Sequence, residues 1–534
     1  MTLVKQSIKL YDTTLRDGSQ TEGISFTVSD KLRIAMKLDE LGIHYIEAGW
    51  PGANPKDIEV FQKLRRLRLR NSKVVAFGST RRAKIKAKDD TILKGLIKAE
   101  TKVITIFGKS WDLHVKEVLR TTMDENINMI RDSVSFLKSK KKEVIFDAEH
   151  FFDGYKANPE YAIATIMAAQ EGGADCIALC DTNGGTITSD VFRIVEDVNR
   201  IIGTPLGIHA HNDCELAVSN SVAAVQAGCV QVQGTMNGLG ERCGNANLTS
   251  IIPILNTKLD FGCVSELQLR SLTDASRFIA ETSNMKQMGN QPFTGASAFA
   301  HKAGVHVNAI MKNPKSYEHL DPSVVGNRRR LLISELSGKS TILRKAEEFN
   351  MQLEKDSPKA KKILKMIQDL EHRGYQFESA EASFVLLMKR AMKEFKSFFK
   401  FEGFRVIVED DKEGNLISEA TIKVKVEGKK EHTAALGDGP VNALDNALRK
   451  ALSEFYPSLD KMHLSDFKVR VLDEKAGTAA KVRVLIQSQD EKDSWWTIGV
   501  SENIIEASWL ALVDSVEYKL LKDSKDSAKD SGRF

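Results

Sequence analysis

The fold is decided by a stretch that begins at Cys176 and ends at Asp213, CIALCDTNGGTITSDVFRIVEDVNRIIGTPLGIHAHND. It consists of a short apolar run, a segment that looks helical, and a second short apolar run that leads into polar residues. Eight runs of this kind start at Ser7, Tyr45, Lys73, Lys102, Glu143, Cys176, Pro205 and Gln231. Their mean separation of about 32 residues matches the ~30 residues of one strand–helix unit.

Eight such units within about 250 residues predict an α/β fold of the (β/α)8 TIM-barrel type. An open doubly wound sheet is the main alternative, but no glycine-rich dinucleotide turn follows the first run. The first intervening segment, Val28–Leu41, has helical periodicity and is expected to begin with Ser29 as its N-cap.

The rest of the chain predicts a different organisation. We expect a catalytic barrel over residues 1–263, a helical connector over 264–395, a C-terminal α+β regulatory domain over 396–521 and a disordered tail over 522–534. The C-terminal domain shows the period-2 alternation of strands. It also contains two similar copies in which a glycine precedes a helix, around Ala434 and Thr497.

Composition excludes several classes of protein. The 534 residues contain 77 Lys+Arg and 72 Asp+Glu, a net charge of +5, without the clustered basic footprint of a nucleic-acid-binding protein. No apolar run reaches the ~18 residues of a membrane span, and MTLVKQSIKL lacks a signal-peptide core. The six cysteines form no C-x-x-C pair. We therefore expect a cytoplasmic protein with reduced thiols and no membrane or nucleic-acid partner.

Polar residues gather where the predicted strands end, which is where barrel enzymes place their active sites. They are Arg16, Asp17, Glu47, Asp147, Glu149, Asp181, Thr182, His209, His211, Asn212, Asp213 and Asn245. Residues i and i+2 of a strand share a face, so His209 and His211 are predicted to lie side by side. Two imidazoles near carboxylates indicate a divalent-metal site. The alternative is one core histidine and one paired with Asp213.

The oxygen and nitrogen donors of this cluster narrow the choice of metal. With Asp17 and Asn245, the two histidines form a mixed set that suits Mg²⁺, Mn²⁺, Co²⁺ or Zn²⁺.

Six motifs resemble those of one enzyme family: TLRDGSQTEG, IEAGWPGANP, GIHAHND, NGLGERCGNANL, HKAGVH and GDGPVNAL. Together they resemble the 2-isopropylmalate, homocitrate and citramalate synthase family over nearly the whole chain. The segment SQTEGISFTVSDKL is most similar to the citramalate synthases of that family. The resemblance implies a metal-dependent Claisen condensation of acetyl-CoA with a 2-keto acid. Pyruvate is the expected acceptor, giving (R)-citramalate for isoleucine biosynthesis.

The resemblance also implies a role for each site residue. The metal ligands would be Asp17, His209, His211 and Asn245. Arg16 would hold the keto acid together with Thr182 and Asp147, and the other catalytic residues would be Glu149, His306 and Tyr317. Either Glu149 or His306 could remove the proton from acetyl-CoA. Glu47 is interpreted as a partner of Arg16.

Two positions depart from the family pattern. Many members have an aspartate where this chain has Asn308. Members also differ at the position of Asp147.

Three other functions remain as alternatives. They are a 2-isopropylmalate synthase acting on 2-ketoisovalerate for leucine biosynthesis, an acyl-CoA lyase or retro-aldol enzyme, and a non-catalytic branched-chain amino-acid sensor. A lyase has no need of the C-terminal domain, and a sensor has no reason to retain the full polar set.

The C-terminal domain is predicted to bind an amino-acid effector. The stretch Gly437-Asp438-Gly439-Pro440 precedes a predicted helix, whose free backbone N–H groups would suit a carboxylate. Family resemblance implies feedback by isoleucine, or else leucine, in a homodimer. The alternative is a domain that serves dimerisation alone.

Overall fold

The computed structural model describes residues 7–51, 55–259, 261–302, 304–332, 358–410, 416–472, 479–491 and 493–530. The chain forms two compact units. One contains residues 1–299 and 320–329, and the other contains residues 300–319 and 330–534.

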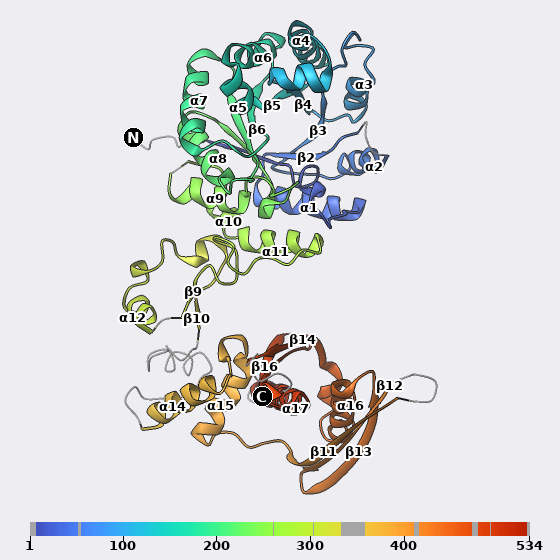
Figure 1. Cartoon of the computed structure of the whole chain (residues 1–534), viewed down its shortest axis with the longest axis vertical. Helices are drawn as coiled ribbons and strands as arrows, with labels where there is room; N and C mark the ends of the chain where they lie inside the picture. The colour runs from blue at the N-terminus through green and yellow to red at the C-terminus, as the bar shows by residue number, and fades with distance from the viewer. Residues whose placement is uncertain are drawn as a thin grey trace. The chain divides into compact units, whose positions relative to one another are not determined.

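The first unit is a closed barrel of eight parallel strands, with helices on its outside (Figure 1). The strands are β1 (Lys9–Asp12), β2 (Tyr45–Gly49), β3 (Lys73–Ser79), β4 (Val103–Lys109), β5 (Glu143–Glu149), β6 (Cys176–Asp181), β7 (Leu206–Ala210) and β8 (Gln231–Gly234). Each predicted run contains one of them, so the predicted TIM barrel is confirmed. The barrel closes where β1 pairs with β8, with Lys9 opposite Gln231.

Amphipathic helices cover the strands. They are α1 (Val28–Leu41), α2 (Pro55–Leu64), α3 (Thr91–Lys98), α4 (Met123–Ser139), α5 (Phe151–Ala157), α6 (Pro159–Gly172), α7 (Thr188–Ile201), α8 (Ala217–Gln226) and α9 (Leu248–Thr257). In α1 the N-cap is Thr27 and not Ser29, because Thr27 and Asp30 form a reciprocal capping box. The apolar face of α1 then packs against the strands through Ile34 and Leu38.

The connector begins with α10 (Glu266–Leu269) and α11 (Leu272–Thr282) in the first unit. In the second unit it comprises β9 (Ala300–His301), α12 (Gly304–Lys312), β10 (Arg330–Leu331), α14 (Pro358–His372) and α15 (Glu381–Met392). Helices therefore dominate its described residues, as the sequence predicts.

The C-terminal part consists of two three-stranded antiparallel sheets, each followed by a helix. The first copy is β11 (Lys400–Asp410), β12 (Leu416–Val426), β13 (Lys429–Gly437) and α16 (Pro440–Leu452). The second copy is β14 (His463–Val471), β15 (Val482–Gln489), β16 (Ser494–Ser501) and α17 (Ile504–Asp530). One core contains buried apolar residues of both copies, such as Val424 and Ile486.

The sequence predicts a disordered tail over residues 522–534, but most of that segment belongs to helix α17. It continues to Asp530, and Lys519 pairs with Asp523 in the next turn (2.7 Å) and with Asp490 before β16 (3.0 Å). Charge pairs along and beside the helix thus extend it into a segment whose composition alone indicates disorder.

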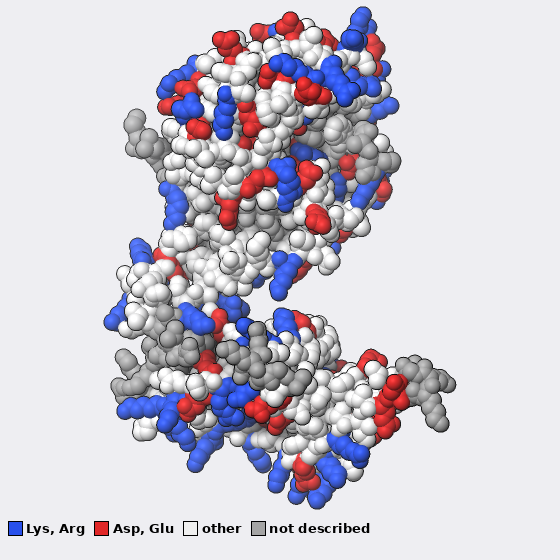
Figure 2. Space-filling view, viewed as in Figure 1, with Lys and Arg blue, Asp and Glu red and all other residues white. Residues whose placement is uncertain are grey.

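Two observations concern the described surface. None of the helices in the described ranges is both long and apolar enough to cross a membrane. On the face shown in Figure 2, acidic and basic side chains are mixed over the barrel unit.

Candidate active site

A cavity of about 250 Å³ lies at the carboxyl ends of the barrel strands. It is lined by residues that follow different strands, which is the usual construction of a barrel active site. Seven predicted site residues line it: Arg16, Asp17, Asp147, Glu149, Thr182, His209 and His211.

Three of the predicted metal ligands form a buried cluster. Nε2 of His209 lies 3.5 Å from Oδ2 of Asp17 and 3.3 Å from Nε2 of His211. Asn245 joins them through a backbone bridge to His211. The side-chain oxygen of Asn245 is buried and has no hydrogen-bond partner among the described residues. Asp17, His209 and His211 are therefore buried close to one another, and the backbone of Asn245 lies beside that of His211.

A side chain that the sequence analysis missed orients His209. Oε1 of Gln233 lies 3.0 Å from Nδ1 of His209, and Nε2 of Gln233 donates to Oδ1 of Asp147 at 2.9 Å. The glutamine oxygen can only accept, so Nδ1 of His209 carries a proton, and Nε2 faces Asp17 and His211. Burial and the neighbouring His209 lower the pKa of His211 to about 3, so this imidazole is neutral at pH 7. The ring of His211 is thus in the form that binds metals, whereas Asp17 outweighs burial and raises the pKa of His209 above its ordinary value.

Charged groups fix the form and position of Asp17 and Arg16. Burial opposes the charged form of Asp17, but Arg16 and His209 hold the pKa of this carboxyl well below its usual range. Arg16 donates through Nε to Glu47 at 2.6 Å, and the hydroxyl of Tyr11 donates to the other oxygen of Glu47 at 2.5 Å. Glu47 is fully buried. Its predicted place beside Arg16 is confirmed.

The remaining polar groups of the cavity are also anchored. Burial, together with the charge of Glu47, raises the pKa of Asp147 to about 7. Glu149 forms an ion pair with Lys109 of β4. The hydroxyl oxygen of Thr182 accepts a hydrogen bond from the backbone N–H of His150 at 2.8 Å, which leaves its own hydrogen free to donate.

Aromatic rings form one wall of this cavity. Trp50 packs edge-on against Phe77 (5.9 Å between centroids) and Phe107 (5.8 Å), and those two rings stack at 5.5 Å. The guanidinium carbon of Arg16 lies 3.8 Å from the centre of the Phe77 ring. This contact presses Arg16 between an aromatic face and a carboxylate, so its charge has little freedom to move.

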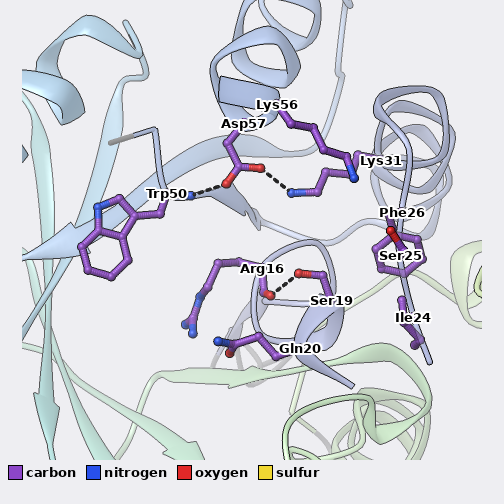
Figure 3. Close-up of a pocket in the computed structure, with 10 residues that line it drawn as sticks. All are labelled: Arg16, Ser19, Gln20, Ile24, Ser25, Phe26, Lys31, Trp50, Lys56 and Asp57. Carbon is purple, nitrogen blue, oxygen red and sulfur yellow. Dashed lines mark hydrogen bonds and ion pairs between the residues drawn. The ribbon is translucent and has the colours of Figure 1, made fainter. Parts of the chain in front are cut away.

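A second cavity of about 320 Å³ adjoins the first and shares Arg16, Gln20 and Trp50 with it (Figure 3). Asp57 connects two sides of this cavity, because it accepts from the backbone of Trp50 at 3.0 Å and from Nζ of Lys31 at 2.7 Å. The buried Lys31–Asp57 pair thereby fixes the backbone of the residue that stands between the two cavities.

Comparisons with known proteins identify the family of this chain. Residues 7–279 match the family model described as HMGL-like, residues 293–374 match homocitrate synthase post-HMGL domain-like, and residues 378–520 match the LeuA allosteric (dimerisation) domain. The (R)-citramalate synthase of Geobacter sulfurreducens is 59% identical, covering 97% of this chain and 98% of that protein. The chain belongs to the 2-isopropylmalate, homocitrate and citramalate synthase family.

Within this synthase family, the chain is more similar to the citramalate synthases than to the 2-isopropylmalate synthases. The (R)-citramalate synthase of Aquifex aeolicus is 55% identical and covers 98% of this chain and 99% of that protein. The 2-isopropylmalate synthase of Methanocaldococcus jannaschii is 30% identical over similar shares, 98% and 96%. The predicted resemblance to citramalate synthases is confirmed.

Other predicted residues of this synthase lie in the second unit. His306 on α12 and Tyr317 are in contact, with ring centroids 4.2 Å apart, and both are exposed. Asn308, the departure from the family pattern, is also exposed on α12. The pairing of the two rings agrees with a shared role, which remains a prediction.

The predicted effector residues of this synthase lie at the start of α16. Helix α16 begins at Pro440, and Gly439 caps it without any side-chain hydrogen bond. In the second copy, the side chain of Asn503 accepts from the backbone N–H groups of Ile505 (2.8 Å) and Glu506 (3.3 Å). Only the first copy therefore offers a helix start without a side-chain cap.

Several lining residues were not predicted as site residues. They are Gln20, Trp50, Phe77, Phe107, Cys180, Glu241 and Arg242. Aromatic residues at strand ends are typical of a core, and Arg242 lies in the motif NGLGERCGNANL, in which only Asn245 was predicted as a site residue. The alternation Gln231, Gln233 in β8 was the one signal that could have found Gln233, because both polar side chains share a face of a buried strand.

Proposed function

We propose that this chain is a cytoplasmic (R)-citramalate synthase that condenses acetyl-CoA with pyruvate and releases CoA, in isoleucine biosynthesis. The observation that supports it most is the buried set of Asp17, His209 and His211 beside Arg16, in a chain 59% identical to a citramalate synthase along 97% of its length. The alternative substrate, 2-ketoisovalerate, is associated with relatives at about half that identity.

The donor set fits a divalent metal. Within the described part of the chain, the side-chain oxygen of Asn245 and Nδ1 of His211 are buried without hydrogen-bond partners, and ligand atoms of Asp17, His209 and His211 lie within 4.8 Å of one another. Such an ion, Mg²⁺, Mn²⁺, Co²⁺ or Zn²⁺, would act as a Lewis acid toward the carbonyl and carboxylate oxygens of the keto acid.

Arg16 and Thr182 would bind and orient the keto acid. Glu47 and the Phe77 ring hold the guanidinium in place before substrate arrives, so no reorganisation is needed when negative charge develops on the carbonyl oxygen. Thr182 already accepts from His150, so its hydroxyl proton is available for a substrate oxygen.

Proton removal from acetyl-CoA starts the reaction. Glu149, which lines the cavity, or His306 removes a proton from the methyl group, and the resulting carbon nucleophile attacks the keto carbon of pyruvate. The carbonyl oxygen becomes a hydroxyl by taking up a proton. Water then cleaves the thioester, giving a carboxylate and the thiol of CoA. The adjoining cavity, which includes Lys31 and Lys56, provides space for the arm of the co-substrate.

The aromatic wall supports a small keto acid. Phe77, Phe107 and Trp50 line the cavity beside Arg16, and we place the substituent of the keto acid against these rings, which leave little room for a branch. A single methylene is worth only ~1–3 kcal/mol of discrimination, so the preference is measurable but not absolute.

Thiol release from acetyl-CoA tests the function directly. Pyruvate, 2-ketoisovalerate and 2-ketoglutarate are each supplied with Mn²⁺ or Mg²⁺, and kcat/KM is compared. We expect pyruvate to be the best substrate and citramalate to be the product. A preference for 2-ketoisovalerate would overturn the substrate assignment, and no thiol release with any keto acid would favour the sensor.

Regulation is proposed for the C-terminal domain, which matches a LeuA allosteric (dimerisation) model. Isoleucine or leucine would bind at Gly437–Pro440 in a homodimer and favour a less active arrangement. The intact enzyme and a variant truncated after Lys400 are both titrated with the two amino acids. We expect inhibition of the intact enzyme only. Light scattering during size-exclusion chromatography should give twice the chain mass.

A further inference from the structure

Three strand-end loops of the barrel converge on the candidate site. The loop after β6 carries Thr182, the segment after β7 carries His211, and the loop after β8 carries Asn245. Their backbones approach closely. A Cβ atom at Gly184 would lie 2.5 Å from Oδ2 of Asp213, and Gly184 has a φ of +61°. Only glycine suits that position, and its lack of a side chain lets the β6 loop approach the β7 loop closely.

Arg242 of the third loop contacts both of the others. Its Nε and Nη2 donate to the two oxygens of Asp213, each at 2.8 Å. Nη2 also donates to the backbone carbonyl of Thr182 at 2.8 Å. The planar guanidinium of Arg242 thus makes a bidentate contact with the β7 loop and a third hydrogen bond to the β6 loop. Asp213 follows His211 by two residues, and Asn245 follows Arg242 by three.

The backbone of Arg242 is itself in an unfavourable conformation. Its φ is +57°, in the left-handed region that non-glycine residues rarely adopt. Such strain persists when surrounding contacts enforce it, and it is concentrated at functional sites. In that backbone conformation, the side chain of Arg242 makes its hydrogen bonds to Asp213 and Thr182.

The partial exposure of the Arg242–Asp213 ion pair favours a positioning role over a purely structural one. The side chains of Arg242 and Asp213 are 42% and 24% exposed, and ion pairs of this kind contribute little to global stability. Their value lies in geometry, because a displacement of ~1 Å at a catalytic group can cost about 100-fold in rate.

We propose that Arg242 is a positioning residue that fastens the β6, β7 and β8 loops together and so sets the relative places of Thr182, His211 and Asn245. The inference rests on the proposed function, since those three residues are its proposed keto-acid and metal contacts. Arg242 itself need not touch the metal or the substrate.

The experiment compares Mn²⁺ binding, by calorimetry on the metal-free full-length protein, in wild type and in Arg242→Gly, Arg242→Lys and Asp213→Asn. Arg242→Gly removes the side-chain contacts but accepts the left-handed backbone. Arg193→Ala is the matched control, because Arg193 also pairs with carboxylates but its side chain is exposed on the surface of α7, away from the strand-end loops. Melting temperature and kcat and KM for pyruvate are measured in parallel.

We expect Arg242→Gly to weaken Mn²⁺ binding by about 10- to 100-fold, with the melting temperature lowered by no more than about 2 °C. Arg242→Lys should retain only part of the Mn²⁺ affinity, because lysine cannot make the bidentate contact with Asp213. Arg193→Ala should bind Mn²⁺ as wild type does. Mn²⁺ affinity within about 2-fold of wild type in Arg242→Gly, with kcat and KM unchanged, would overturn the inference.

The outcome also separates this inference from the proposed function. If wild type neither binds Mn²⁺ nor releases thiol, the function fails. If wild type does both and Arg242→Gly behaves identically, only the positioning role fails.

Discussion

The mouth of the barrel and the start of α16 each carry a set of functional residues predicted for this chain, and the two sets differ in burial. At the barrel mouth, Asp17, His209 and His211 are buried and lie against one another. At the start of α16, Asp438 is exposed and the cap at Gly439 has no side-chain hydrogen bond. The first site is assembled within one unit. The second offers mainly backbone groups.

This difference has a physical consequence for how each site would recognise a ligand. Buried groups that are fixed before binding give strong and specific electrostatics, because no water has to reorganise. An open helix start attracts a carboxylate through its N–H groups and dipole but discriminates little by itself. Substitutions should therefore have large effects on chemistry at the barrel mouth and smaller effects at α16.

The largest effect is expected from His209→Ala combined with His211→Ala. Loss of both imidazoles removes the proposed metal site, and several kcal/mol of charge stabilisation with it, so kcat/KM should fall at least ~1,000-fold. Thiol-release assays and metal analysis after dialysis measure both quantities. His432→Ala, an exposed histidine of β13, is the control. Normal turnover in the double variant would refute the metal-dependent scheme.

Arg16→Lys should have the next largest effect. Lysine keeps the charge but cannot bond Glu47, stack on Phe77 and reach the substrate at once. We expect kcat/KM for pyruvate to fall ~100-fold, as for the loss of one transition-state donor. Arg193→Lys on the surface of α7 serves as the comparison. An Arg16→Lys enzyme with the kinetics of wild type would contradict the role of the fixed guanidinium.

Burial at the barrel mouth should also appear as a pH dependence of stability. The pKa of Asp147 is raised by burial and Glu47 to about 7, above the ~3.9 of an unfolded chain. The native state thus takes up a proton, and the stability this contributes is complete below about pH 4 and lost as the pH rises through about 7.

Asp147→Asn removes this titration and keeps the acceptor for Gln233. Between pH 5 and pH 8, metal-free wild type should therefore lose more stability than the variant, by up to about 1.4 kcal/mol per pH unit below pH 7. Urea unfolding at each pH gives the two curves, with Asp438→Asn as an exposed carboxylate control. Parallel curves for wild type and Asp147→Asn would show that this carboxyl does not titrate as described.

The smallest expected effect is on stability, and it differs between Gly437 and Gly439 at the start of α16. A Cβ at Gly437 would lie 2.3 Å from the backbone nitrogen of Ala443, whereas nothing lies within 4 Å of one at Gly439. Gly437→Ala should reduce the free energy of unfolding by ~1–3 kcal/mol, and Gly439→Ala by less than ~0.5 kcal/mol. Chemical denaturation measures both. Equal values for the two variants would mean that this turn is not tightly built.

The sequence predicted the barrel well because its strands are buried on both faces. Such strands read as continuous apolar runs, and the regular spacing of eight runs leaves few other folds. Asp17, His209 and His211 could be predicted for a related reason. Polar residues at the ends of buried strands are conspicuous, and the topology of a barrel brings those ends together.

The supporting side chains could not be predicted from local pattern. Gln233 matters because β7 lies beside β8 and places His209 within reach. Phe77 and Phe107 matter because they meet Trp50 and Arg16, and each reads alone as an ordinary core residue. The N-cap of α1 and the end of α17 were missed because side chains of Asp30 and Asp490 complete contacts that periodicity does not reveal.

The pairing of β1 with β8 has a consequence for the order of events during synthesis. Asp17 follows the first strand and Asn245 follows the last, so the proposed ligands lie up to 228 positions apart in the sequence. A ribosome-bound chain that ends before β8 cannot present that set, and neither can a half-barrel fragment. Uptake of the ion would thus report that the ring of strands has closed, which gives a way to time barrel assembly in a nascent chain.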